Sequence, residues 1–299
     1  MDIKNIVIGL PETGKTTFLA ALWHVVTSRE ISGSLTLNEY PPERGYIEKL
    51  VRKWLDLESV GRTSQESINQ IVMKLTSPAD NATEEIVFPD VSGELYRDEI
   101  LKGRICSPAS YALFQKASNI LLFVNPNRIQ GPDRIDEVGS KGSSSTPKSS
   151  SLAELDALLA PSANAATEST PIPWEPDLVP TQVKMVELLQ LIASICENKF
   201  GIAVVVSAWD RIPQPCTPSE WLRKELPLLH QFLMANSGEY RCKFFGVSAF
   251  GGDPEKDVSA LGRKHTRPSD RIIVHEDHGT PHHDITAPIR WLIFKDAAN

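Results

Sequence analysis

The sequence predicts an α/β fold, a doubly wound and mostly parallel sheet with helices on both faces. Two observations predict it. Short runs of β-branched and aliphatic residues recur without alternating apolar and polar positions, as in strands that are buried on both faces. Helical patterns separate most of these runs, so strands and helices alternate along the chain. In such sheets, ligands bind at the carboxyl ends of the strands.

The expected elements follow one another along a single domain. Strands are expected at residues 5–8, 86–88, 120–124, 202–206 and 243–247, with weaker candidates at residues 35–37 and 68–75. Helices are expected at residues 16–26, 42–57, 182–196, 220–234 and 285–294. Because 41% of the 299 residues are hydrophobic, one large core is available, and we predict a single domain over residues 1–299.

Directly after the first strand, residues 9–17 read GLPETGKTT, which has the form G-x-x-x-x-G-K-[ST] of a phosphate-binding P-loop. Glycines let backbone N–H groups converge on phosphate oxygens, a lysine supplies a cation for the β- and γ-phosphates, and the next hydroxyl coordinates Mg²⁺. The alternative is a fortuitous glycine turn. The predicted nucleotide-binding residues of this loop are Gly9, Glu12, Thr13, Gly14, Lys15, Thr16 and Thr17, with Thr16 also a magnesium ligand.

Two regions interrupt the alternation of strands and helices. Residues 32–78 carry more structure than a minimal nucleotide-binding domain requires, and we interpret them as an elaboration next to the active site. Residues 127–180 are rich in Gly, Ser, Ala, Thr and Pro. Such a composition buries too little apolar surface to offset the entropy of ordering, so we expect a mostly disordered insertion.

Charge, cysteine usage and hydropathy narrow the class of protein. A net charge of −7 without a dense Lys/Arg stripe argues against direct binding of nucleic acid. The four cysteines are scattered with no C-x-x-C pair, so we expect neither a zinc site nor a disulfide framework. No apolar run approaches the ~20 residues that a membrane span needs, and residues 1–4 lead straight into the first strand without a secretion signal. These features favour the cytoplasm.

Three further motifs follow the later strands. Residues 90–94 read DVSGE, which has the form D-x-x-G, although an Asp at this point also suits the Walker-B strand of another P-loop NTPase. Residues 207–210 read SAWD and follow the strand at 202–206. Residues 246–250 read GVSAF, at the end of the last expected strand. All three motifs lie where a parallel sheet gathers its ligand contacts.

The four motifs in this order resemble the Ras-like branch of P-loop GTPases over nearly the whole chain. The signatures at 90–94 and 207–210, with the closing PIRWL at 288–292, are most similar to the bacterial double-GTPase family. The resemblance implies a small-GTPase-like domain in which residues 32–78 elaborate the switch I region. It also implies GTP or GDP and Mg²⁺ as ligands, and a role as paired GTPases in multi-protein conflict or defence systems.

The resemblance assigns further roles by position. It implies that Asp90 holds Mg²⁺ through water and that the Gly93 amide senses the γ-phosphate. It implies that a backbone amide at Ser248 and Ala249 meets guanine O6. Asp210 corresponds to the last residue of Asn-Lys-x-Asp, whose carboxylate accepts two hydrogen bonds that guanine offers and adenine does not. Its alternative role is to cap the turn before Pro213.

The sequence departs from the family pattern at the base. Ser207 stands in place of the Asn, and Ala208 replaces the Lys whose stem covers the base, so we expect weaker affinity or selectivity for guanine. Glu94 stands where many members carry the water-orienting Gln. A carboxylate there is repelled by the γ-phosphate, so we predict slow intrinsic hydrolysis. Arg97, three residues on, is a candidate for neutralising it.

The segment before the second motif supplies the remaining catalytic candidates. Thr63 is the preferred switch I threonine, a magnesium ligand, and Arg62 is the candidate arginine finger in cis, which would stabilise charge in the transition state. A solvated arginine in a polar loop is the alternative. The cluster His275-Glu276-Asp277-His278, with His282, His283 and Asp284, lacks the spacing of a metal site. We interpret it as a solvated loop in which Asp284 caps the last helix.

The leading hypothesis is therefore a guanine-nucleotide switch with slow, Mg²⁺-dependent GTP hydrolysis, which uses Glu94 and Arg62 in catalysis. The expected partner is a protein, either a second GTPase or another copy of the chain. One alternative is a scaffold that binds nucleotide without hydrolysis and pairs with an active GTPase. Another is a P-loop ATPase or kinase, in which Asp210 has no role in base selection.

Overall fold

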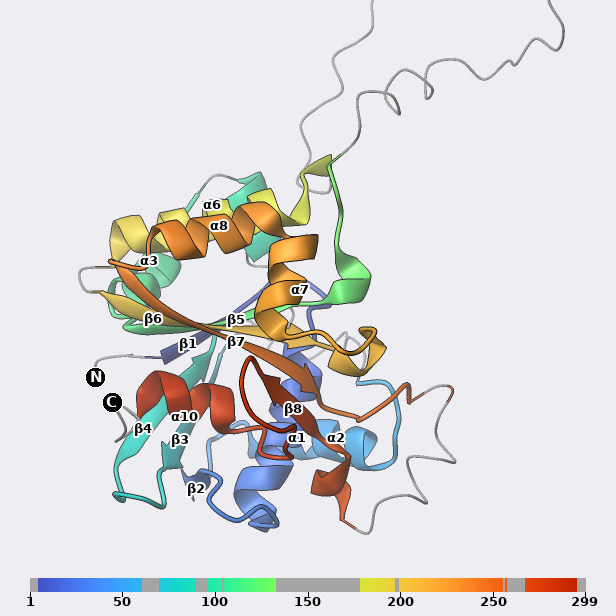
Figure 1. Ribbon diagram of the computed structural model, residues 1–299. Coiled ribbons are helices and arrows are strands. Elements are labelled where there is room, and N and C mark those ends of the chain that lie inside the picture. Colours follow the sequence, from blue (N-terminus) through green and yellow to red (C-terminus); the bar gives the residue numbers. More distant parts are fainter. Residues whose placement is uncertain are drawn as a thin grey trace, which may run out of the picture.

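The computed structural model describes residues 5–60, 70–89, 96–103, 105–132, 178–196, 199–254, 256 and 267–294. Within them, one sheet has the strand order β2-β3-β4-β1-β5-β6-β7-β8, with helices on both sides (Figure 1). The strands are β1 (Asn5–Ile8), β2 (Thr36–Glu39), β3 (Ile71–Thr76), β4 (Thr83–Phe88), β5 (Asn119–Val124), β6 (Phe200–Ser207), β7 (Tyr240–Ser248) and β8 (Ile273–Glu276).

Helices connect and cover the strands. The α-helices are α1 (Lys15–Ser28), α2 (Arg44–Leu55), α3 (Pro108–Gln115), α6 (Thr181–Ile195), α7 (Pro218–Glu225), α8 (Pro227–Ala235) and α10 (Ala287–Ile293). The short helices of other types are η1 (Tyr96–Lys102), η2 (Pro126–Arg128), η4 (Trp209–Arg211) and η5 (Pro268–Arg271). No helix among the described residues is long and apolar enough to cross a membrane.

The middle of the sheet is parallel and its edges are antiparallel. β1 pairs in parallel with β4 and β5, β5 with β6, and β6 with β7. β3 pairs antiparallel with β2 and β4, and β8 pairs antiparallel with β7. These pairings confirm the α/β fold and its mostly parallel sheet. Because parallel strands point the same way, the loops that follow β1, β5, β6 and β7 all lie at the carboxyl ends of the strands, on one side of the sheet.

Each face of the sheet buries its own apolar core. Against one face, α1, α2 and α10 pack onto strand residues such as Val7 and Phe123. Against the other face, α3, α6, α7 and α8 pack onto their neighbours Ile8 and Leu122. Successive side chains in a strand point to opposite faces. Two covered faces therefore require an apolar residue at every position, which is why the central strands show no alternation in the sequence.

The helix expected at residues 220–234 is wrong as a single element. The structure has two helices there, α7 and α8, with Leu226 between them outside the helical conformation. Pro227 is the cause, because it lacks an N–H and disfavours the helical conformation of the residue before it. The helix α3 was not expected from the sequence. It begins at Pro108, and Ser107 caps it by accepting a hydrogen bond from the Ser110 N–H.

The loop expected before the last helix is wrong for residues 273–276, which form the edge strand β8. Gly246 pairs with His275, and Val247 pairs with Val274. Only Val274 is fully buried in this strand, and the polar residues His275 and Glu276 follow it directly. An edge strand pairs with a neighbouring strand on one side only and can bury side chains on one face only, so it needs few apolar residues. Such a short pattern resembles a polar loop.

The insertion expected at residues 127–180 is described only at its two ends, and residues 133–177 lie outside the described part. The ends meet. The Thr181 N–H donates to the Gln130 carbonyl at 3.0 Å, and the Gln130 N–H donates to Thr181 Oγ1 at 2.9 Å. The described residues on the two sides of this segment, after η2 and at the start of α6, thus lie next to each other.

Candidate nucleotide-binding site

The loop between β1 and α1 has the backbone of a phosphate-binding turn. Gly14 has φ +91°, and Glu12 also has a positive φ of 60°. A Cβ on Gly14 would lie 3.0 Å from Ser207 Cβ, so glycine is required there both for its conformation and for the close approach of β6. Thr13 closes the turn through a 2.8 Å hydrogen bond from its hydroxyl to the Leu10 carbonyl.

Lys15 is the charged group of this loop. Its side chain is buried, and its Nζ donates to the carbonyls of Gly9 at 2.7 Å and Leu10 at 2.9 Å. A Cβ on Gly9 would lie 2.7 Å from Thr13 Oγ1 and 2.9 Å from Phe123 Cβ, so the loop cannot carry a side chain at this point. The ammonium is therefore fixed against the loop by contacts within residues 9–15.

The N-terminus of α1 follows the loop. Its N-cap is Gly14, which provides no capping side chain, and its first turn contains no acidic residue. The N–H groups at a helix start carry partial positive charge and bind anions when no side chain satisfies them. Thr16 and Thr17 belong to this first turn, and Thr16 brings a hydroxyl to it. The predicted phosphate-binding residues are thus together in the structure.

Three residues beyond the P-loop support it, and the sequence analysis missed two of them, Asn125 and Arg128. The Asn125 side chain donates to the Glu12 carbonyl at 2.8 Å, and Arg128 Nε lies 2.7 Å from Glu12 Oε2. Ser207 also approaches from β6, and its hydroxyl donates to the Val124 carbonyl at 3.2 Å. The available signal was position, because Asn125 directly follows β5, whose neighbour in the sheet is β1.

The predicted base-recognition residues come from two different strands and meet. Asp210 lies in η4 after β6, and Ser248 is the last residue of β7. The Ser248 hydroxyl donates to Asp210 Oδ1, and it accepts a 2.9 Å hydrogen bond from the Gly251 N–H. Among the described residues, Asp210 Oδ2 accepts no hydrogen bond, and no turn N–H donates to the carboxylate. The contacts thus give no support to a turn-capping role for Asp210.

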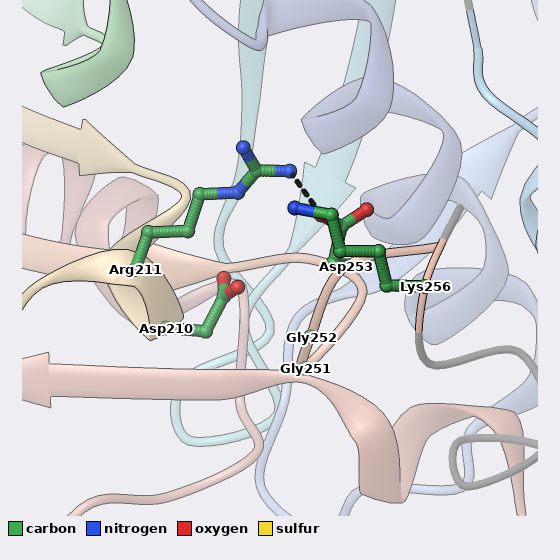
Figure 2. A pocket seen from close by; sticks show the side chains of 6 residues that line it. All are labelled: Asp210, Arg211, Gly251, Gly252, Asp253 and Lys256. Atoms are coloured by element: carbon green, nitrogen blue, oxygen red, sulfur yellow. Dashed lines mark ion pairs between the residues drawn. The ribbon is translucent and has the colours of Figure 1, made fainter.

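A pocket of about 430 Å³ opens beside this carboxylate (Figure 2). Arg211 Nη2 lies 3.1 Å from Asp253 Oδ2, and Lys256 Nζ lies 3.5 Å from the same oxygen. The sequence analysis did not single out these three charged residues, although Arg211 directly follows the motif at 207–210 and Asp253 comes shortly after the motif at 246–250. The pocket is lined by Asp210, Arg211, Gly251, Gly252, Asp253 and Lys256.

Trp209 fixes η4 onto the sheet. Its ring is almost fully buried and lies directly over Gly246, where a Cβ would come within 2.2 Å of the indole. The ring centroid of His275 on β8 is 5.9 Å away. Glycine at 246 therefore makes room for a tryptophan that holds the next residue, Asp210, in place.

The remaining predicted site residues lie outside the described part of the chain. They are Arg62, Thr63, Asp90, Gly93 and Glu94. The structure does fix where the second motif begins, because β4 ends at Phe88 and pairs in parallel with β1, with Ile6 opposite Val87. Residue 90 thus follows a strand whose end adjoins the start of the P-loop.

Glu276 of the His/Asp/Glu cluster pairs with His282 in the cluster and with Lys243 outside it. Glu276 lies 3.3 Å from His282 Nε2 and 2.6 Å from Lys243 Nζ. The hydrogen bond from His282 and the ammonium of Lys243 lower the pKa of Glu276 to about 2, against the opposing effect of burial. Asp284 accepts the N–H of Thr286 at the start of α10. Across the described ranges, no three His, Cys, Asp or Glu residues are grouped as metal ligands.

Residues 6–292 match the family model described as Double-GTPase 1. The chain belongs to the double-GTPase 1 family. Membership supports a GTP-binding domain, in agreement with the P-loop and with the pairing of Asp210 and Ser248. No curated protein matches the chain in sequence.

Solved structures similar to this double-GTPase domain are distant. A bacterial selenocysteine-specific elongation factor EF-Sec is 16% identical with a TM-score of 0.37, over 88% of this chain and 28% of that one. Methanosarcina barkeri Roco2 RocCORdC, bound to GDP, is 13% identical with a TM-score of 0.33, over 88% and 49%. The S. cerevisiae Ski7 GTPase-like domain, bound to GTP, is 12% identical with a TM-score of 0.36, over 84% and 43%. The chain spans less than half the length of each.

Proposed function

We propose that this double-GTPase domain is a guanine-nucleotide switch, which binds GTP and GDP with Mg²⁺ and hydrolyses GTP slowly. One observation carries the proposal. The carboxylate of Asp210 is oriented by Ser248 and lines a pocket. This pocket and the P-loop both lie at the carboxyl ends of the parallel strands. A nucleotide needs both a phosphate site and a base site, and the two are connected here through neighbouring strands.

At the phosphate end, the proposed contacts come from Lys15 and the first turn of α1. The carbonyls of Gly9 and Leu10 hold the Lys15 ammonium close to the loop, so little side-chain entropy remains to be lost when phosphates bind. N–H groups at the helix start complete the oxygen contacts. This part of the site is common to all nucleoside phosphates and does not select the base.

At the base end, selection comes from the carboxylate. Guanine offers N1–H and N2–H donors, which match the two oxygens of Asp210, whereas adenine would leave a charged group unpaired. The Ser248 hydroxyl fixes one of those oxygens. Ala208 supplies no stem to cover the base, and we assign the cationic side of the pocket to Arg211, held by Asp253, together with Lys256.

The oxygen ligands fit magnesium. Thr16 offers a hydroxyl in the first turn of α1, and Asp90 and Thr63 would add a carboxylate and a second hydroxyl, all hard donors of the kind that Mg²⁺ prefers. When bound, the ion neutralises charge on the β- and γ-phosphates. We assign Arg62 to the same task and expect Glu94, as a carboxylate near phosphate, to keep hydrolysis slow.

The biological role follows from the family resemblance. We propose that the γ-phosphate orders residues 61–64 and 92–98 and so changes a surface that a protein partner recognises, in the cytoplasm. The partner is a second GTPase or another copy of this chain. A regulatory part in a bacterial conflict or defence complex is the corresponding proposal at the cellular level.

The test is a titration of nucleotide-free protein with GTPγS, GDP and ATPγS in Mg²⁺, followed by single-turnover hydrolysis of GTP. The proposal predicts that GTPγS and GDP bind tightly and that ATPγS binds at least about a hundredfold more weakly. It also predicts slow release of phosphate from GTP. Guanine binding with no phosphate release would favour the non-hydrolysing scaffold. Equal or tighter binding of ATPγS would favour the ATPase or kinase and overturn the proposal.

A further inference from the structure

The inserted helix α2 is hydrogen-bonded directly to the base-binding loop, residues 248–253. The indole Nε1 of Trp54, in the last turn of α2, donates to the Ala249 carbonyl at 2.9 Å, across 195 residues of sequence. Trp54 is fully buried, with 0% of its surface exposed. A partly buried hydrogen bond between such distant segments fixes the loop relative to the helix.

Arg271 strengthens the same junction from the other side. Its Nη2 donates to the Trp54 carbonyl at 3.1 Å and its Nη1 to the Leu55 carbonyl at 3.5 Å, at the C-terminus of α2. Its guanidinium lies 4.5 Å from the centre of the Trp54 ring. The cation thus satisfies the last carbonyls of the helix and complements the negative end of its dipole.

The base-binding loop rests on the backbone of Arg271. Gly251 has φ +76°, and a Cβ on it would lie 2.1 Å from the Arg271 carbonyl oxygen. The Gly251 N–H donates to the Ser248 hydroxyl, which in turn donates to Asp210. A continuous series of contacts therefore joins the carboxylate that faces the pocket to the end of α2.

The helix that carries the P-loop lysine packs against the same tryptophan. The rings of His24, in α1, and Trp54 are 5.2 Å apart. His24 contacts Glu30, and Glu30 Oε2 accepts hydrogen bonds from the N–H and the hydroxyl of Ser269 in η5. Trp54 therefore lies between α1, which follows the phosphate site, and Arg271, which supports the base site.

From these contacts we infer that Trp54 and Arg271 are positioning residues for guanine recognition, which tie the base-binding loop to α2. The inference rests on the proposed function. A base bound at Asp210 stabilises the loop from Ser248 to Gly251 and, through Trp54, the last turn of α2. Thermodynamic linkage is reciprocal, so if base binding stabilises the last turn of α2 by some free energy, ordering that turn strengthens base binding by the same free energy.

Trp54→Phe tests the hydrogen bond, because phenylalanine keeps an aromatic ring and loses the N–H. We expect GDP to bind about three- to tenfold more weakly, as for the loss of one partly buried hydrogen bond. We expect unchanged affinity for inorganic pyrophosphate, because it has no base to contact residues 248–253. The matched control is Trp221→Phe, a buried tryptophan of α7 on the opposite face of the sheet, which should change neither affinity. Equal losses for GDP and pyrophosphate would show a general structural role and overturn the inference.

Amide hydrogen exchange of the wild-type protein provides a test that needs no variant. GDP should slow exchange at residues 52–57 and 249–252, whereas pyrophosphate should slow it only at residues 12–18. Protection of the P-loop and of residues 208–211 by GDP, with none in residues 52–57, would overturn the inference and leave the proposed function intact. No protection by GDP at any of these sites would overturn both.

Discussion

The phosphate end and the base end of this site are built in different ways. At the phosphate end, Lys15 Nζ donates to the carbonyls of Gly9 and Leu10 in its own loop. At the base end, Asp210, Ser248 and Lys256 come from separate segments that the fold brings to one pocket. The P-loop has hydrogen bonds within its own motif and is supported by Asn125 after β5, whereas the composite base site is assembled by strand order and by contacts such as the one between Trp54 and Ala249.

The difference also concerns tolerance to substitution. Gly9 and Gly14 have no space for a side chain, and Lys15 is buried. At the base end, the rim is exposed, with 44% of the Arg211 side chain and 80% of the Lys256 side chain open to solvent. We therefore expect substitutions at the phosphate end to act on every nucleotide, and those at the base end to act selectively and less strongly.

The largest effect is expected for Lys15→Ala. Loss of the charged donor should weaken GDP and ADP alike by about a hundredfold or more, as for hydrogen bonds between charged groups. Isothermal titration measures both affinities. Lys199→Ala is the matched control, because the Lys199 ammonium also binds a backbone carbonyl, that of Gly238. A loss confined to GDP would contradict the comparison, since it would make the phosphate end selective for the base.

Ser248→Ala should have an intermediate effect. Without the hydroxyl, Asp210 loses its donor and the Gly251 N–H loses its acceptor, so GDP should bind about tenfold more weakly. Pyrophosphate affinity should stay the same. Ser194→Ala, which removes a hydroxyl on α6, controls for the substitution itself. If pyrophosphate binding fell in parallel with GDP binding, the two ends of the site would not be separable.

Arg211→Ala should have a small and salt-dependent effect. Its ion pair with Asp253 is partly exposed, and a rim cation of this kind should contribute about a two- to threefold gain in GDP affinity at low ionic strength. The difference between variant and wild type should vanish in high salt. Lys224→Ala, an exposed cation on α7, is the control. A larger loss that persists in high salt would indicate that Arg211 packs directly on the base.

The smallest expected effect on the site comes from Glu276→Gln, which should alter stability rather than nucleotide affinity. The folded-state pKa of Glu276 is about 2, below the ordinary value of 4.5, so its ionised form stabilises the fold. This contribution is fully present above pH 4.5 and is lost as the pH falls towards 2. We expect the variant to unfold more easily by about 1 kcal/mol at neutral pH, since solvent screens the partly exposed Glu276 side chain.

Denaturant unfolding of wild type and Glu276→Gln between pH 7 and about pH 2.5 checks this sign. The difference between them should shrink towards acid. Glu39→Gln provides a matched control at the other edge of the sheet, where Glu39 pairs with Lys74 but is 60% exposed. A difference that grows as the pH falls would show that Glu276 is not held ionised by His282 and Lys243.

Much of the phosphate end could be predicted from the sequence, because strand, loop and helix are contiguous in residues 5–28. The buried strands could be predicted as well, since covered faces require unbroken apolar runs. The edge strand β8 could not, because Val274 is its only fully buried residue. The break at Pro227 was overlooked although the proline itself signals it.

The supporting contacts of the site could not be predicted from the sequence, and the reason is physical. Asn125 reaches Glu12, and Trp54 reaches Ala249, only because β5 adjoins β1 and α2 packs beside the end of β7. Neither residue belongs to a motif, and each resembles an ordinary polar loop residue or core aromatic. By contrast, Asp210 and Ser248 were identifiable because each directly follows or ends a strand.

Asp210→Asn, titrated with GDP and xanthosine diphosphate, tests the central claim most directly. Guanine has an N2 donor where xanthine has a carbonyl, and an Asn amide offers the N–H that this carbonyl needs. If Asp210 reads the base, the wild type prefers GDP, and the variant prefers xanthosine diphosphate with unchanged affinity for pyrophosphate. If both proteins show the same preference between the two nucleotides, Asp210 does not select the base, and the account of the base end is wrong.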